Sequence, residues 1–482
     1  MKTIRISVIF LLFSLSLMTA SLFASIRMGT PFCDGMILQN KCDVAIWGQA
    51  APKSTVTLIA SWNYNKKVKT QADETGRWKT TISTPKGSFT PYTLTVNDGE
   101  SILMIRDVLI GEVWLASGQS NMEMPLTGWK DSPLTNSQKL IAGSTAYSGK
   151  LHFINVPRAC TRNTQDTIAA SWQNCLPSTV GNFSAVAYHF ACTLINTLKM
   201  PVGIINCCWG GSCLKAWEPG PLLKKYGMEI TDSLFLHPDQ CTPSGLFNGM
   251  LSPFIGYTIK GFIWYQGESE AFSRATTYAQ HFSDMIKWWR KEWNIGNLPF
   301  YFVEISPYQY SHPDGLEAPL IREQQNKVAH MLDNVGMVAT NDLVTAKELK
   351  QIHPANKQPV GQRLANWALA NDYKQPNVVF SHPEFKSMTF KSKRIFLQFT
   401  NTPNGFNRQD DITGFEVCGA DSVFHPVKAS EKSGKIMLRC DSINKPIAVR
   451  YCFKNFQLGN LASKEGLPVI PFRTDNFPLK KQ

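Results

Sequence analysis

Short runs of alternating apolar and polar residues fill the chain from residue 26 to residue 106. Alternation with a period of two places successive side chains on opposite faces of a strand, and turn signals such as Asp73-Glu74-Thr75-Gly76 separate the runs. The runs with this pattern are 44–47, 55–59, 66–70, 78–82 and 92–96. Residues 26–106 are therefore predicted to form an N-terminal β-sandwich domain.

The period changes after Asp107. Fully apolar runs now alternate with amphipathic stretches of helical spacing, which is typical of an α/β domain whose parallel sheet is sandwiched by helices. The predicted strands are 113–116, 202–207, 259–264, 299–305 and 335–340. Two helices are clear, one from about Thr276 to Trp293 and one from about Gln358 to Asn371. We expect this α/β domain to span residues 107–375.

Strand-like alternation returns after Pro376. The predicted strands are 394–399, 413–417, 436–440 and 448–453. Residues 376–482 are therefore expected to form a C-terminal β-rich domain.

Residues 1–25 are typical of a signal peptide. Lys2 and Arg5 precede an apolar run over 8–18, and small residues follow it between Ala20 and Ser25. The run is short for a membrane span, and no later stretch reaches 18 apolar residues. We expect export to the periplasm or the extracellular space after cleavage, without stable membrane insertion.

Charge and cysteine content narrow the function classes. The 49 Lys and Arg residues exceed the 36 Asp and Glu residues by 13, but they are scattered along the chain, which argues against nucleic-acid binding. A basic surface is compatible with acidic ligands, glycans included. The 12 cysteines predict some disulfides in an oxidising compartment, although Cys207, Cys208 and Cys213 fit buried free thiols equally well. No cysteine spacing is typical of structural zinc, and no metal is expected.

The stretch 113–124 changes from a buried strand to a polar turn between Ala116 and Ser120. A serine at the carboxyl end of a parallel strand lies where such sheets bind ligands, and nearby backbone N–H groups would stabilise an oxyanion. Ser120 is therefore a candidate nucleophile. The alternative is that Ser120 caps a helix.

Three further segments are predicted at the same sheet edge: 209–212, 264–269 and 352–354. The first contains Gly210-Gly211, which allows close backbone approach to a ligand or simply forms a tight turn. The second offers an amide, Gln266, and a carboxylate, Glu268. The third contains His353, which is either a structural histidine or the base that takes the serine proton.

These segments together resemble the sialate O-acetylesterase family. The similar stretches are GQSNMEMP at 118–125, WGGS at 209–212, KGFIWYQGESEA at 260–271, IHPANKQPVGQRLANWAL at 352–369 and, in the leading β-domain, MILQNKCDVAIWGQA at 36–50. That family belongs to the SGNH-type hydrolases, whose sheet is flavodoxin-like, and has relatives among acetylxylan esterases.

The resemblance implies a serine esterase without a cofactor. It assigns Ser120 as nucleophile and His353 as general base. The N–H groups of Ser120, Gly210 and Gly211, with the Gln266 side chain, would form the oxyanion hole, and Glu268 would orient its loop.

One position departs from the family pattern. The family commonly carries an aspartate two residues before the histidine, and this chain has Gln351 there. A glutamine accepts a hydrogen bond from the imidazole but brings no charge to an imidazolium. Either Ser120 and His353 work as a dyad, or Glu348 or Asp342 reaches in from the same loop.

The expected substrate is an acetylated sugar or glycan, with O-acetylated sialic acid as the first hypothesis. Acetylxylan or another acetylated polysaccharide is the second, and a non-catalytic glycan-binding protein on the same fold is the third. An arginine fork is suited to the sialate carboxylate. The candidates, each of which is otherwise a solvated surface residue, are Arg158, Arg162, Arg274 and Arg322.

Overall fold

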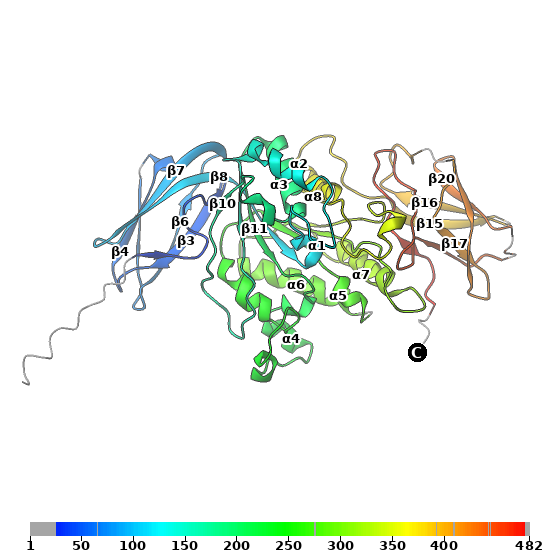
Figure 1. Cartoon of the computed structure of the whole chain (residues 1–482), viewed down its shortest axis with the longest axis horizontal. Coiled ribbons are helices and arrows are strands. Elements are labelled where there is room, and N and C mark those ends of the chain that lie inside the picture. The colour runs from blue at the N-terminus through cyan, green and yellow to red at the C-terminus, as the bar shows by residue number, and fades with distance from the viewer. Residues whose placement is uncertain are drawn as a thin grey trace, which may run out of the picture.

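A computed structural model describes residues 26–477 except 65, 274–275, 392, 408–409, 442 and 444. The predicted signal peptide, 1–25, lies outside the described residues. Sheets occupy both ends of an elongated molecule, and the helices lie in its middle (Figure 1). Among the described residues, no helix is both long enough and apolar enough to cross a membrane.

The N-terminal strands form two sheets. One has the order β1-β3-β6, and the other is built by β2, β4, β5 and β7 on the first half of β8. The bounds are β1 Arg27–Met28, β2 Ile37–Gln39, β3 Asp43–Gln49, β4 Thr55–Ala60, β5 Lys67–Gln71, β6 Arg77–Ser83, β7 Ser88–Asn97 and β8 Ile102–Gly118. All five strands predicted in this region are confirmed.

Strand β8 joins this unit to the central one. Its first half pairs with β7 and β2, and its second half, from Glu112 to Gly118, lies between β11 and β12 in parallel register. The boundary predicted between residues 106 and 107 therefore falls inside a continuous 17-residue strand rather than in a linker. Val108 to Gly118 are all buried, so the second half of this strand has no solvated residue at which the chain would turn away.

The central sheet has the order β10-β9-β11-β8-β12-β13-β14. Neighbouring strands are parallel except for β10, which is antiparallel to β9. The bounds are β9 Leu151–Asn155, β10 Gln173–Asn174, β11 Val202–Cys208, β12 Gly261–Tyr265, β13 Phe300–Val303 and β14 Val335–Val338. The predicted parallel strands are confirmed, and β9 and β10 are additional.

Helices cover both faces of this sheet. Side chains alternate along β8, so that Val113 and Leu115 pack in one apolar core with α6 and α7, and Trp114 and Ala116 pack in another with α3 and α8. The bounds are α1 Ser120–Glu123, α2 Ser137–Gly143, α3 Ala185–Leu198, α4 Gly220–Lys225, α5 Glu268–Ala271, α6 Tyr278–Trp293, α7 Glu317–Met331 and α8 Gln358–Asn371. The two predicted helices correspond to α6 and α8.

The C-terminal strands form two antiparallel sheets, β15-β16-β20-β19 and β18-β17-β21-β22, around a separate apolar core. The bounds are β15 Glu384–Lys391, β16 Arg394–Thr400, β17 Phe415–Cys418, β18 Phe424–Pro426, β19 Lys428–Lys432, β20 Lys435–Arg439, β21 Ala448–Tyr451 and β22 Phe472–Arg473. The fold is thus mixed α/β, with a central mixed sheet and additional antiparallel sheets.

Candidate active site

Ser120 is the first residue of α1, immediately beyond the carboxyl end of β8. Gly118 makes this turn possible: its φ is +135°, and a Cβ there would lie 2.2 Å from the Tyr265 carbonyl oxygen of β12. The N-cap position belongs to Gln119, so Ser120 does not cap the helix. Its backbone N–H has no intrahelical acceptor, as is usual in the first turn, and the side chain is half-buried.

Asn121, the next residue, is fully buried and joins three segments. Its Nδ2 donates to the Ile352 carbonyl oxygen at 3.0 Å and to the Glu268 carboxylate. Its Oδ1 accepts a hydrogen bond from Lys357 Nζ at 2.5 Å. Asn121 follows Ser120 and Ile352 precedes His353, so this amide brings the serine and histidine segments together. We call Asn121, Glu268 and Lys357 the Asn121 junction.

The charged members of the junction are both 2% exposed. Burial raises the pKa of Glu268, while Asn121 and the Lys357 ammonium oppose that shift. Burial lowers the pKa of Lys357 to about 7, against the attraction of Glu268 and Glu348. The Glu268 carboxylate is therefore stabilised first by the Asn121 amide and also by Lys357, and the Lys357 ammonium is stabilised first by Glu268. Buried ionic groups require such partners.

His353 is half-buried and packs edge-to-face against Trp129, with ring centroids 4.9 Å apart. Its Nδ1 lies 3.3 Å from Ser132 Oγ, and the Ser132 hydroxyl donates to Gln351 Oε1 at 3.1 Å. The same Gln351 oxygen accepts the His353 backbone N–H at 3.1 Å. Burial and the nearby Lys357 ammonium lower the pKa of His353 to about 4. The ring is therefore neutral, which suits a base, and an uncharged pair orients it.

Neither carboxylate proposed to replace the missing aspartate faces the His353 ring. Glu348 accepts hydrogen bonds from the Thr345 N–H and hydroxyl and from the Ala355 N–H. Asp342 holds the Arg363 guanidinium through both of its oxygens, at 2.8 and 2.6 Å. The hypothesis of a relocated acid is therefore corrected, because local capping and a bidentate ion pair commit these groups elsewhere.

The Gly210-Gly211 turn follows β11 and lies against the serine. A Cβ on Gly210 would lie 3.3 Å from Ser120 Cβ, so the two backbones approach closely. The Gly210 N–H donates to Glu123 Oε2 at 2.8 Å, which corrects its expected role as an oxyanion donor. Gly211, at φ +74°, has an N–H without an acceptor among the described residues.

The Gln266 side-chain amide also donates its hydrogen bonds within the protein. It is fully buried, and its Nε2 donates to the Ser212 carbonyl oxygen at 3.1 Å and to Glu270. Its role is to tie the 209–212 turn to α5, not to donate to an oxyanion. Burial raises the pKa of Glu270 to about 7 despite these contacts.

Sequence reasoning missed Gln119, the amide residue directly before Ser120. Its Oε1 accepts the N–H groups of Gly267 at 3.2 Å and Ser269 at 3.3 Å. With the oxygen fixed in this way, the Nε2 of Gln119 has no acceptor among the described residues and lies one residue from the serine. The only signal in the sequence was a polar side chain directly before Ser120.

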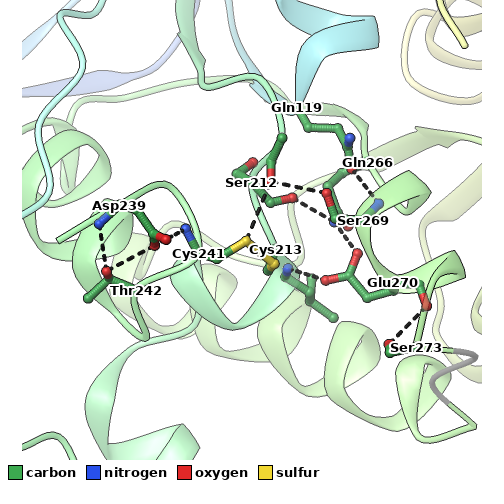
Figure 2. The surroundings of a disulfide bond; sticks show 12 residues. Gln119, Ser212, Cys213, Asp239, Cys241, Thr242, Gln266, Ser269, Glu270 and Ser273 are labelled. Carbon is green, nitrogen blue, oxygen red and sulfur yellow. Dashed lines mark hydrogen bonds between the residues drawn. A yellow bond between two sulfur atoms is a disulfide. The ribbon is translucent and has the colours of Figure 1, made fainter. Parts of the chain in front are cut away.

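A disulfide braces this edge. Cys213 and Cys241 are joined, and Figure 2 shows the bond beside Ser212, with Gln119, Ser269 and Glu270 next to it. The Gln240 side chain lies over Gly211, 3.4 Å from where its Cβ would be. The expected disulfide thus exists at Cys213, whereas Cys207 and Cys208 are buried thiols.

The four candidate arginines differ in their burial and in their contacts. Arg158 is half-exposed near the serine: its Nε and Nη2 donate to Glu123 Oε1 at 3.0 and 2.6 Å, and its guanidinium lies 5.7 Å from the Trp209 ring centroid. Arg162 pairs with Asp232. Arg322 is 1% exposed and donates to the Lys454 carbonyl oxygen, which removes it as a ligand for substrate. Arg274 lies outside the described residues.

The chain is similar to known carbohydrate esterases. Residues 110–370 match the family model described as carbohydrate esterase, sialic acid-specific acetylesterase. The chain is 27% identical to mouse sialate O-acetylesterase, covering 91% of this chain and 92% of that protein, and 29% identical to the human enzyme, covering 94% of each. A solved carbohydrate acetylesterase from Xanthomonas citri superimposes with a TM-score of 0.85 at 31% identity, covering 94% of this chain and all of that one.

The described residues contain no group of three His, Cys, Asp or Glu side chains arranged to hold a metal ion.

The electrostatics predict an unusually acidic imidazole. In an NMR titration of histidine ring resonances, we expect His353 to titrate at a pKa of about 4 because its ring is buried near a cation. Lys357→Met removes that cation and is expected to raise the His353 pKa. A His353 resonance that titrates near 6.5, the ordinary value, and ignores this substitution would contradict the geometry.

Proposed function

The chain belongs to the sialic acid-specific acetylesterase family of carbohydrate esterases, and we propose that it removes O-acetyl groups from sialic acid with Ser120 as its nucleophile. The observation that carries the catalytic assignment is the Asn121 bond to the Ile352 carbonyl, which joins the segment of Ser120 to that of His353. Further support comes from the N–H donors that surround the serine.

In the proposed reaction, Ser120 Oγ attacks the acetyl carbonyl and His353 Nε2 takes the hydroxyl proton. The developing oxyanion is stabilised by the Ser120 and Gly211 N–H groups and by the Gln119 amide. The sugar oxygen leaves with the proton from His353. Water then attacks the acetyl-serine, His353 takes its proton and returns it to Ser120, and acetate departs.

Ser132 and Gln351 would take the place of the usual acid. The Ser132 hydroxyl donates to Gln351, so in the proposed tautomer the His353 Nδ1–H donates to Ser132 Oγ. This neutral pair fixes the tautomer and the ring orientation without adding negative charge. The site would then work as a Ser120–His353 dyad whose imidazolium is stabilised less than in a triad with aspartate.

The fold class, the division of the chain into units and its export are part of the same proposal. We assign the central sheet and its helices, 107–375, to the SGNH-type hydrolases, between β-rich units at 26–106 and 376–482. The composition of residues 1–25 supports export, to the periplasm or beyond the cell.

Arg158 is the residue we assign to the sialate carboxylate. It is linked to the serine segment, because its partner Glu123 belongs to α1 and also holds the Gly210 N–H. The Arg158 side chain is 55% exposed and keeps its Nη1 available for a ligand. The ion pair with Glu123 neutralises the Arg158 guanidinium. This pairing favours a second candidate substrate, a neutral acetylated polysaccharide such as acetylxylan.

Removing the nucleophile tests the catalytic assignment. Ser120→Ala is expected to lower kcat on 4-nitrophenyl acetate by about three orders of magnitude or more while leaving the fold intact, because one oxygen is lost at an accessible edge. Ser430→Ala, on the exposed face of β19, is the matched control and should keep full activity. Turnover by the wild type would exclude a non-catalytic glycan-binding protein. A Ser120→Ala enzyme with a tenth or so of wild-type turnover would sink the assignment of the nucleophile.

Discrimination between substrates tests the role of Arg158. In Arg158→Ala, KM for O-acetylated sialic acid should rise roughly tenfold more than KM for an acetylated xylo-oligosaccharide, because only sialate loses a charge-assisted pair worth about 1.5–3 kcal/mol. The ratio of the two KM values cancels any disturbance of Glu123 that affects both substrates. Arg162→Ala, which removes an exposed pair with Asp232, should leave the ratio unchanged. An unchanged ratio in Arg158→Ala would favour the polysaccharide alternative.

A further inference from the structure

A hollow of about 820 Å³ lies between the sheet β1-β3-β6 and the central unit. One wall is the sheet itself, and the other comes from two segments of the central unit, 166–167 and 252–255. We call this hollow the junction groove. None of its lining residues belongs to the serine, glycine or histidine segments of the active site. Its volume is in the range of small-ligand sites.

The strand register places a defined set of side chains on the groove wall. Gln49 of β3 pairs with Arg27 of β1 and with Arg77 of β6, and Trp47 pairs with Lys79. Since residues two apart on a strand share a face, these five side chains lie on one face of the sheet. Lys79 Nζ lies 3.7 Å from where a Cβ of Gly256 would be, so this face is turned toward the central unit.

Trp47 is a rigid platform on this wall. Phe32 packs against it at 4.6 Å between ring centroids and nearly perpendicular, which fixes the indole plane. A Cβ on Gly29 would lie 2.3 Å from Trp47 Nε1, so only glycine leaves room for that edge of the ring. The indole is half-buried, and a flat apolar surface beside polar groups matches the C–H face of a pyranose ring.

The hydrogen-bonding groups around the indole differ in their contacts. Arg27, Gln49 and Lys79 are exposed, and among the described residues neither Arg27 nor Gln49 has an ion pair or a side-chain hydrogen bond. The Lys79 ammonium lies over the Trp47 ring, 5.8 Å from its centroid, so it borders the aromatic face on which a sugar would lie. Arg77 pairs with Asp166 at 2.8 Å, which links the two walls. Planar amide and guanidinium groups next to an aromatic face suit sugar hydroxyls and carboxylates.

We propose that the junction groove is a second carbohydrate-binding site, with a pyranose ring on Trp47 and its polar groups on Arg27, Gln49 and Lys79. The site binds glycan without cleaving it and would anchor the enzyme to its substrate. It goes beyond the esterase function, because binding in the groove requires neither Ser120 nor an acetyl group.

Binding of unacetylated sugars to the full mature chain tests this site by calorimetry. The probes are sialyllactose for an acidic glycan and xylohexaose for a neutral one, and binding of either supports the site and identifies its class. Trp47→Ala is expected to weaken that binding roughly tenfold. Its kcat/KM on 4-nitrophenyl acetate should stay within about twofold of wild type, since the groove shares no residue with the active site.

Two variants guard against ambiguous results. Gln49→Ala removes an exposed side chain with no packing role and should also weaken binding, which covers the case in which Trp47→Ala folds poorly. Tyr64→Ala removes a 99% exposed aromatic residue of the same unit and should leave binding unchanged. If neither probe binds, or if Trp47→Ala and Gln49→Ala bind as the wild type does, the proposal is overturned. If the esterase assignment failed in the Ser120→Ala experiment, the binding result for the junction groove would still hold, because the probes carry no acetyl ester.

Discussion

The active edge depends on one buried amide. Asn121 satisfies a carboxylate, an ammonium and a backbone carbonyl that come from α5, the start of α8 and the histidine loop. Burying Glu268 or Lys357 without a partner would cost several kcal/mol, so the amide and the two charges have to be placed together. Because the amide belongs to the residue after Ser120, the same contacts that satisfy the charges also fix the distance between the serine and histidine segments.

The central sheet brings these segments together at its carboxyl edge. Strands β8, β11 and β12 end in register at Gly118, Cys208 and Tyr265, and each is followed by a polar turn. The turns are then tied to one another by side chains: Gln266 donates to Ser212, Glu123 accepts from Gly210, and the Cys213–Cys241 disulfide holds the next loop. The backbone around Ser120 is thus held in position without a substrate, which is what the proposed oxyanion site requires.

The sequence predicted what periodicity and strand ends determine. Apolar runs located the parallel strands, helical spacing located α6 and α8, and the strand-end rule brought Ser120, Gly210 and His353 to one edge. It did not predict where side chains point. Gln266 was expected to face the substrate but is turned inward, and Gln119 was overlooked, because the direction of an amide depends on partners distant in sequence. Glu348 and Asp342 were candidates because they are close to His353 in the sequence. In the structure, however, Glu348 belongs to a capping box and Asp342 forms an ion pair with Arg363. The change of period at Asp107 does not mark a break in the chain, because the partly exposed first half of β8 pairs in the N-terminal unit and its buried second half pairs in the central sheet.

The central claim is that Ser120 is a nucleophile activated through the Asn121 junction, and covalent labelling tests it most directly. A fluorophosphonate probe reacts with a serine only when a base activates it, and peptide mass spectrometry locates the adduct. We expect a single label on Ser120 in the wild type and a rate of labelling roughly 10²-fold lower in Asn121→Leu, which keeps the branched shape of the side chain but releases the Ile352 carbonyl. A label on another residue of an active enzyme, or equal rates in the two proteins, would contradict the account.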